Sequence, residues 1–292
     1  MTTEPDTRWT VCNVFEQPER QARIIDISRY WRTGGIDWSL LKGNFDAVII
    51  AAGVGFKSDV LLLEHTEKAV EHDVPYATFH IPDPAMDMAE QAHFYSELPE
   101  VKTHKVFGDW EPPYKGSREP DQVEFLYYLI ALDGYTEQEA GVYSRIEIIK
   151  RMGSPDYLKK RDLWLAQYIY EIYTEAKKVK YRKFEPWLER YAWKLLPAVI
   201  GTGLEENVKI QQFTDFGDAR FYCANRITAD PKNVYGMTSA DLNVSVGEYR
   251  EFMKWFVMGA VVPEPPPEPE PTGCNAFMAQ VAAVVDKWRE TE

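Results

Sequence analysis

Residues 45–52, with the sequence FDAVIIAA, decide the fold class. Apart from Asp46 the run is apolar at every position, which is typical of a strand that is buried on both faces of a sheet. Such strands belong to parallel sheets, because the helices that connect parallel strands cover both faces. The stretch therefore predicts an α/β fold with a parallel sheet at its centre.

Strand-like and helix-like segments alternate on both sides of this run. Further strands are expected at residues 23–28, 75–81, 104–110, 141–144, 163–168, 209–213 and 241–244. Helices are expected between them, at residues 36–41, 59–72, 85–98, 121–132 and 146–152. Strands that alternate with helices form βαβ units, and eight such strands predict a parallel β/α barrel of the TIM type. An open, doubly wound sheet is the alternative.

The chain is expected to carry extra segments around the barrel. An arm at residues 1–22 precedes a barrel domain at 23–258, into which a helical insertion at 169–207 is placed. Residues 259–272 contain PEPPPEPEP, which predicts an extended, semi-rigid linker. The tail at 273–292 has apolar residues at helical spacing, so we expect a short helix that docks on the barrel or binds a protein partner.

Composition argues against several classes of protein. The 33 basic and 46 acidic residues give a formal net charge of −13, which disfavours a nucleic-acid-binding surface. Cys12, Cys223 and Cys274 are an odd number without metal-ligand spacing, so no disulfide framework, metal site or cofactor is expected. No apolar stretch reaches the roughly 20 residues of a membrane span, and the first ten residues do not resemble a signal peptide. We therefore expect synthesis in the cytoplasm.

Asp109 and Glu111 end one predicted strand, in the sequence FGDWEP. Side chains alternate across a strand, so both carboxylates point to the same side, at the strand end where barrel enzymes assemble their sites. Two close carboxylates cannot both ionise at low cost, and the one that keeps its proton can donate it to a glycosidic oxygen. A solvated surface pair and a metal site are the alternatives.

Asp26 in IIDIS and Asp241 in ADLNV are acidic residues within apolar strands. A buried acid is costly unless it is paired or functional, so each could be a structural carboxylate that accepts backbone hydrogen bonds. Together with Asp109 and Glu111, they predict four carboxylates at one end of the barrel.

The sequence at this point resembles glycoside hydrolase family 25, the lysozymes or muramidases of fungal, bacterial and phage origin. The motifs that carry the resemblance occur in order over about residues 23–256. They are IDIS (25–28), GGIDWSLLKG (34–43), FDAVIIAAG (45–53), GDWEP (108–112), GVYSR (141–145), LWLAQY (163–168), IQQFTDFG (210–217) and ADLNV (240–244).

The resemblance implies an irregular form of the parallel β/α barrel and an enzyme that cleaves the β-1,4 bond between N-acetylmuramic acid and N-acetylglucosamine in peptidoglycan glycan strands, without a cofactor. Glu111 matches the family's catalytic acid, and Asp109 matches its partner, which orients the substrate 2-acetamido group or stabilises charge. Asp26 and Asp241 match two further acids that line the site. An endolysin-like protein of this kind would act at the bacterial cell wall after release by phage lysis or from a virion.

Aromatic and polar residues near the other strand ends are expected to line sugar subsites. They are Tyr76, His80, Tyr143, Trp164, Gln167, Tyr168 and Gln212. Tyr143 and Trp164 match family positions near the substrate groove. For His80, a structural role with a hydrogen-bonded ring is at least as well supported as a role in a subsite. Asn243 is expected to position Asp241 or a loop beside the substrate.

The sequence also departs from the family. Trp110 replaces a small aliphatic residue in the acidic motif, GVGFKSD follows the second strand, the third strand ends in FHIP, and the insertion is long. These differences leave two alternatives to a muramidase. One is a cell-wall-binding barrel without turnover, and the other is a glycosidase for a different polysaccharide.

Overall fold

The computed structural model describes residues 21–29, 36–101, 104–167, 202–218, 239–247 and 249–257. They belong to one compact unit that spans residues 21–260. Four predicted segments lie outside the described residues: the arm apart from residues 21–22, the insertion apart from 202–207, the linker and the tail. None of the described helices is long and apolar enough to cross a membrane.

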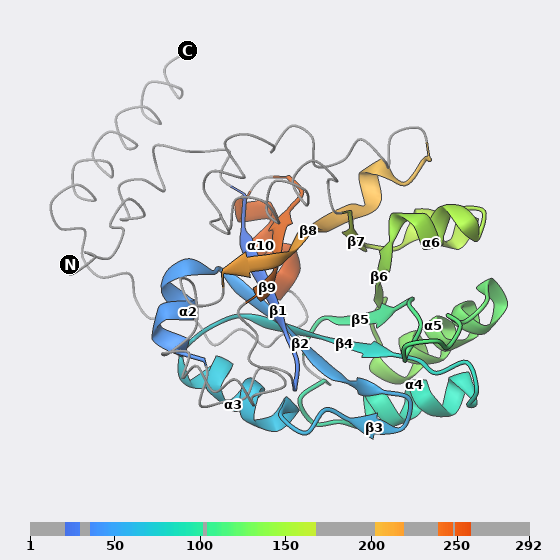
Figure 1. The fold of residues 1–292 in the computed structure, drawn as a ribbon, viewed down its shortest axis with the longest axis horizontal. Coiled ribbons are helices and arrows are strands. Elements are labelled where there is room, and N and C mark those ends of the chain that lie inside the picture. Colours follow the sequence, from blue (N-terminus) through green and yellow to red (C-terminus); the bar gives the residue numbers. More distant parts are fainter. Residues whose placement is uncertain are drawn as a thin grey trace, which may run out of the picture. The chain divides into compact units, whose positions relative to one another are not determined.

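Eight strands form a closed barrel (Figure 1). They are β1 (Arg23–Ile27), β2 (Ala47–Val54), β4 (Tyr76–Ile81), β5 (Val106–Asp109), β6 (Gly141–Arg145), β7 (Leu163–Ala166), β8 (Val208–Asp218) and β9 (Ser239–Ser245). Their order is β1-β9-β8-β7-β6-β5-β4-β2, and β2 pairs with β1 to close the ring. This closure confirms the predicted barrel and excludes the open sheet. A two-residue strand, β3 (Lys57–Ser58), pairs with β2 alone.

The barrel is mixed rather than wholly parallel, because β9 runs antiparallel to both of its neighbours, β1 and β8. The expectation of an all-parallel ring was wrong for this strand. Parallel neighbours need a crossover connection, whereas strands that are adjacent in both sequence and sheet can return antiparallel. The alternation of side chains along a strand is the same in either direction, so the sequence pattern could not distinguish the two.

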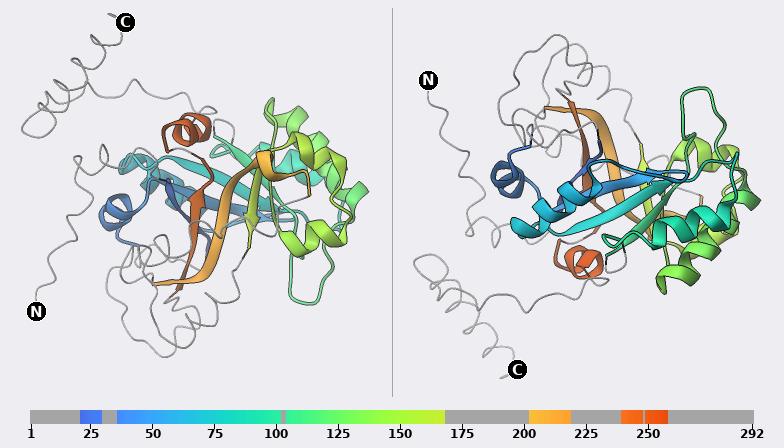
Figure 2. Two further views of the ribbon diagram at one scale, coloured as in Figure 1. Left: turned by 90° about the horizontal axis from the view of Figure 1, so that it is seen from above. Right: turned by 90° about the horizontal axis from the view of Figure 1, so that it is seen from below.

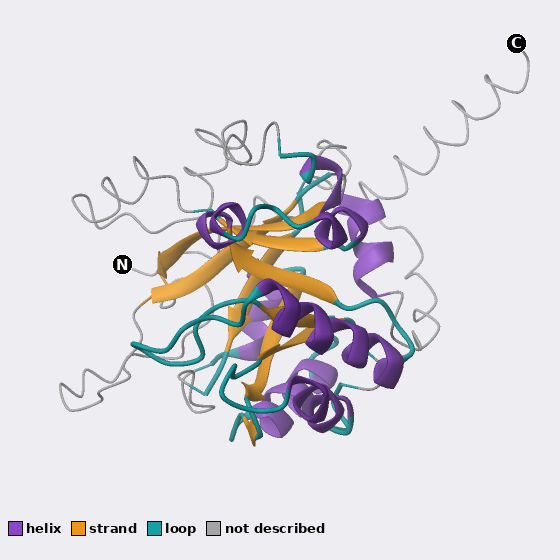
Figure 3. Ribbon diagram, turned by 90° about the vertical axis from the view of Figure 1, so that its right-hand side faces the viewer, coloured by secondary structure: helices purple, strands orange, loops and turns teal. Residues whose placement is uncertain are grey.

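Five helices follow the strands, as predicted, and lie outside the ring (Figure 3). They are α2 (Trp38–Asn44), α3 (Leu62–Glu71), α4 (Met88–Ser96), α5 (Gln122–Thr136) and α6 (Ile146–Arg151). Three of them begin after an aspartate whose side chain accepts a hydrogen bond from the first turn: Asp37, Asp87 and Asp121. These caps satisfy backbone N–H groups that would otherwise lack a partner, which explains where the helices start.

Side-chain alternation divides the core into two layers. Residues such as Ile25, Val48 and Val142 pack between the strands and the helices. Their neighbours of opposite parity, such as Ile24 and Ile49, fill the barrel interior together with Phe107, Tyr143, Trp164 and Ile210. The parity of a strand residue therefore decides whether its side chain reaches the interior or the helix layer.

One helix, α10 (Tyr249–Val257), was not predicted as an element and closes one end of the barrel. Its Phe252 and Phe256 belong to the interior cluster. Trp255 donates a hydrogen bond to Asp162 at 2.6 Å, and Lys105 lies over its ring at 4.1 Å. Because Lys105 and Asp162 directly precede β5 and β7, α10 lies at the amino ends of these strands. Both views of Figure 2 show it beside the strands.

Candidate active site

Asp26 and Asp241 face each other across the β1–β9 pair. Asp26 is 8% exposed, and its Oδ2 accepts hydrogen bonds from Gln212 Nε2 at 3.1 Å and Asn243 Nδ2 at 2.8 Å. Burial raises the pKa of Asp26 to about 6, although hydrogen bonds from Asn243, Asp241 and Gln212 oppose this shift. The side chains of Asp26 and Asp241 thus form a hydrogen-bonded carboxyl pair across β1 and β9.

Asp109 is the last residue of β5 and has the parity of Phe107, so its side chain faces the barrel interior. It is 4% exposed, and within the described residues its Oδ1 has no hydrogen-bond partner. Burial raises the pKa of Asp109 well above its usual range, and repulsion by Glu111 and Asp26 raises it further. Asp109 therefore couples the pair on β1 and β9 to Glu111.

Glu111 follows β5 by two residues, and its side chain is 24% exposed. Its Oε1 lies 2.6 Å from Nε of Arg145, the last residue of β6. Burial raises the pKa of Glu111, Arg145 opposes that shift, and Glu147 and Glu119 add to it by repulsion. In the described ranges no group of three His, Cys, Asp or Glu side chains is placed to hold a metal ion.

Sequence reasoning missed Arg145 as a site residue, although it lies in the quoted motif GVYSR. The register of the parallel pair explains its position, because Asp109 lies opposite Tyr143. Two residues after this pair, Arg145 at the end of β6 lies beside Glu111, which follows the end of β5. The motif alone contained the arginine, but only the pairing of β5 with β6 brings it to the acid.

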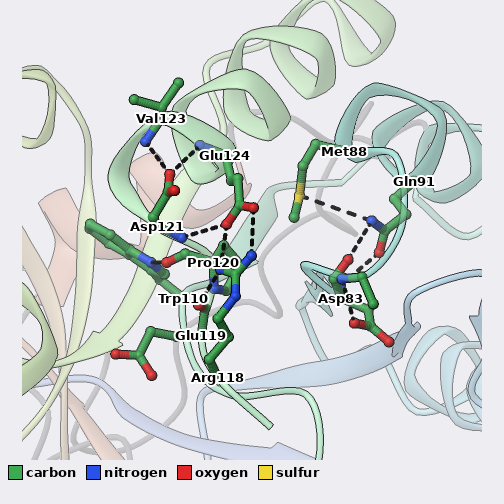
Figure 4. A network of polar contacts seen from close by, with 11 residues as sticks. Asp83, Met88, Gln91, Trp110, Arg118, Glu119, Pro120, Asp121, Val123 and Glu124 are labelled. Carbon is green, nitrogen blue, oxygen red and sulfur yellow. Dashed lines mark hydrogen bonds and ion pairs between the residues drawn. The ribbon is translucent and has the colours of Figure 1, made fainter.

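Trp110, the unusual residue of the acidic motif, points away from the carboxylates. Its ring stacks on Phe125 of α5 at 4.8 Å, and its indole N–H donates to the carbonyl of Pro120 at 2.8 Å (Figure 4). Gly108 has the same parity, and a Cβ at this position would lie 3.1 Å from side-chain atoms of Leu129. The helix α5 therefore packs directly on β5, and Trp110 belongs to the helix layer.

Four of the predicted subsite residues face the interior and form two series of hydrogen bonds, each of which ends at Asp26. The Tyr143 hydroxyl donates to Gln212 Oε1 at 2.9 Å, and Gln212 donates to Asp26. The Trp164 indole donates to Asn243 Oδ1 at 2.8 Å, and Asn243 also donates to Asp26. Since Trp164 is only 1% exposed, this geometry fits residues that hold Asp26 in place.

Tyr76 and His80 have the opposite parity and face the helix layer. The two ring nitrogens of His80 contact the Tyr128 hydroxyl at 2.9 Å and the Gly55 carbonyl at 2.8 Å. Burial lowers the pKa of His80 to about 4, so the ring is neutral and structural. Tyr76 stacks on His104 at 3.7 Å at the amino end of β4. The structure therefore does not bring either residue to the carboxylates.

Two other candidates, Gln167 and Tyr168, follow β7 in the sequence. Tyr168 lies outside the described residues. The backbone N–H of Gln167 donates to the carbonyl of Gln212 at 3.0 Å, which places Gln167 next to the chain that leads to Asp26. Its side-chain Oε1 is buried and has no hydrogen-bond partner among the described residues.

Comparison with known proteins shows similarity at the level of structure. No protein-family model and no curated protein matches the sequence. A bacterial lysozyme from Streptomyces coelicolor superimposes with a TM-score of 0.59 at 14% identity, covering 82% of this chain and 99% of the lysozyme. The catalytic domain of an endolysin from bacteriophage P40 of Listeria monocytogenes gives 0.53 at 17% identity, covering 82% and 98%.

A family 25 glycosyl hydrolase from Bacillus anthracis gives a TM-score of 0.55 at 15% identity, covering 80% of this chain and 93% of the hydrolase. At this level of identity the likeness concerns the fold. The chain has the irregular α/β barrel of the family 25 glycosyl hydrolase and of these lysozymes.

Proposed function

We propose that this protein is a muramidase, which hydrolyses the β-1,4 bond between N-acetylmuramic acid and N-acetylglucosamine in peptidoglycan. The observation that carries the proposal is the cluster of four carboxyl groups, Asp26, Asp109, Glu111 and Asp241, on a barrel shared with lysozymes. Mutual repulsion and burial raise the pKa of several of these groups, so the cluster retains a proton at a pH where isolated carboxyls have lost theirs.

Glu111 is the carboxyl best placed to use that proton. Asp109 is almost fully buried, whereas the Glu111 side chain is 24% exposed and can be reached by a glycosidic oxygen. Glu111 protonates the leaving oxygen as general acid while the bond breaks. Asp109 faces the same end of the barrel and assists by orienting the 2-acetamido group or by stabilising positive charge.

The remaining interior residues position these groups. Asp26 is hydrogen-bonded to Asp241 and is held by Gln212 and Asn243, which are in turn bonded to Tyr143 and Trp164. Such a network fixes the carboxyls before the substrate arrives, so little reorganisation is needed during the reaction. In this proposal Gln212, Asn243, Tyr143 and Trp164 hold the catalytic acids in position and border the bound substrate.

The proposed site of action is the bacterial cell wall, which the protein reaches after release from the cytoplasm by phage lysis or as part of a virion. Peptidoglycan glycan strands are its proposed partner. The division into an arm (1–22), a barrel (23–258), a linker (259–272) and a tail (273–292) is part of the proposal, in which the tail docks on the barrel or binds another protein.

The decisive test replaces Glu111 with glutamine, which has the same size but cannot donate the acidic proton. Hydrolysis of purified peptidoglycan, followed as new reducing ends, should fall by about 10²–10⁴-fold, the usual contribution of a general acid. The matched control is Glu67→Gln on the exposed face of α3, which should keep full activity. A Glu111→Gln variant with wild-type activity and an unchanged circular dichroism spectrum would contradict the proposal.

The ion pair between Arg145 and Glu111 favours a second candidate function. An acid that is held as a carboxylate cannot donate a proton, so the barrel could bind cell-wall glycan without cleaving it. This candidate predicts that the protein sediments with purified sacculi while no soluble fragment appears. Release of fragments by the wild-type protein would reject it.

A further inference from the structure

Arg145 is the cation that acts on the carboxylate cluster from the end of β6. Its Nε lies 2.6 Å from Glu111 Oε1, and its charge lowers the pKa of both Glu111 and Asp109. An arginine at this position opposes the proton retention that a general acid needs. The pair therefore requires an explanation beyond the proposed acid chemistry.

The rest of the guanidinium is available to a ligand. The Arg145 guanidinium presents five N–H donors in a planar fork. Within the described residues its only ion pair is the one between Nε and Glu111. The side chain is 47% exposed, and although Arg145 is the N-cap residue of α6, it makes no side-chain capping bond there. The terminal Nη groups are thus free to take a planar anion in bidentate geometry, as arginine commonly does with carboxylates.

Resting on the proposed function, we propose that Arg145 recognises a carboxylate of the glycan and in doing so releases Glu111. The guanidinium exchanges the Glu111 carboxylate for the carboxylate of the glycan. Binding of an acidic sugar and release of Glu111 from the ion pair therefore occur together. In peptidoglycan the carboxylate comes from the lactyl group of a muramic acid without peptide, or from the peptide stem. A neutral glycan lacks this group and leaves Glu111 paired.

The groups around Glu111 explain why release matters. Glu147 from the first turn of α6 and Glu119 from the segment before α5 both repel a negative charge on Glu111. Arg145 is the charge that opposes them. Once Arg145 turns to the substrate, this repulsion is no longer offset and Glu111 takes up a proton from solvent.

The first test measures binding without turnover. In the Glu111→Gln background, calorimetric titration compares peptide-free muramyl glycan oligomers with the same oligomers after conversion of their carboxylates to methylamides. We expect about tenfold tighter binding of the acidic form, since a bidentate charge-assisted pair contributes at least that factor. Adding Arg145→Met should abolish the preference, whereas Lys150→Met, on the exposed face of the same helix, should keep it.

A preference that survives Arg145→Met overturns the proposal, and so does the absence of any preference for the acidic form among both the peptide-free and the peptide-bearing oligomers. Oligomers that carry peptides distinguish the two sources of the carboxylate. A preference seen with the peptide-free oligomers assigns the lactyl carboxylate, which is already an amide wherever a peptide is attached. A preference seen only with the peptide-bearing oligomers, and removed when their stem is amidated, assigns the stem carboxylate.

The second test follows the proton. In the free protein, Arg145→Met should raise the pKa at which the Glu111 carboxyl titrates by carbon NMR, and Arg145→Lys should raise it less because the charge remains. The high-pH limb of peptidoglycan hydrolysis should move upward in the same order. An unchanged Glu111 titration in Arg145→Met contradicts the inference.

If the wild-type protein cleaves nothing, the proposed function fails, while the binding and NMR measurements still decide the role of Arg145.

Discussion

At the scale of single residues, the interior carboxyls oppose folding at neutral pH. Asp26 has a raised pKa because burial penalises its charged form more than Asn243, Asp241 and Gln212 favour it. The folded chain therefore holds the proton more tightly than the unfolded chain. The associated stability is fully present below the ordinary pKa of 3.8 and is lost as the pH rises through about 6.

Asp26→Asn should therefore stabilise the protein at neutral pH. The amide oxygen can accept the bonds from Gln212 and Asn243, its amino group can donate to Asp241, and no charge remains to be buried. The gain in the free energy of unfolding, measured by urea denaturation, should reach about 3 kcal/mol at pH 7 and disappear near pH 4. Asp73→Asn, at a side chain that is 89% exposed, serves as the control. Equal stabilities of Asp26→Asn and wild type at pH 7 would refute this account.

At the scale of elements, the connection from β5 to α5 sets the position of Glu111. The Trp110 indole is fixed to Pro120, and Asp121 and Glu124 form a reciprocal capping box at the start of α5 (Figure 4). Arg118 reinforces this box with two hydrogen bonds to Glu124, at 2.6 and 2.7 Å. Both ends of the segment that follows Glu111 are thus held against α5.

Substitutions at Trp110 should separate the packing from the hydrogen bond. Trp110→Phe keeps most of the stacking on Phe125 but removes the indole N–H that donates to the Pro120 carbonyl. The unpaired carbonyl should lower the free energy of unfolding by about 1–3 kcal/mol. Trp110→Ala also creates a cavity, and we expect a loss of about 3–5 kcal/mol in urea unfolding. Tyr114→Phe, at a residue 43% exposed, should cost little. Wild-type stability of Trp110→Ala would show that the segment is held in another way.

At the scale of the whole barrel, closure depends on α10 as well as on the strand ring. Phe252 and Phe256 of this helix are 4% and 1% exposed, and both pack into the interior cluster together with Phe107 and Trp164. The interior is thus one continuous core from α10 toward the carboxylates. Loss of packing at the amino ends should therefore weaken the entire barrel.

Phe256→Ala tests this continuity. It should lower the free energy of unfolding by about 3–5 kcal/mol, as for other buried aromatic residues. Circular dichroism and tryptophan fluorescence should shift to the same new midpoint, since a single cooperative core unfolds as a unit. Lys254→Ala, at a side chain 69% exposed on the same helix, is the control. Separate midpoints for the two probes would indicate that α10 unfolds independently.

Local patterns in the sequence determined the strands and the five helices that follow them. These properties depend on periodicity and capping within a few residues, so they can be derived without knowing the neighbours. The resemblance to family 25 added the roles proposed for the acids. All eight predicted strands are present in the barrel, with ends shifted by a few residues.

Only the tertiary structure decided which parity of β4 faces the interior, because both sets of its side chains are largely apolar or aromatic. His80 and Tyr76 were misplaced for this reason. The direction of β9, the approach of Arg145 to Glu111 and the raised pKa of Asp26 likewise depend on strand pairing and burial. These are relations between segments far apart in the chain, and no local pattern contains them.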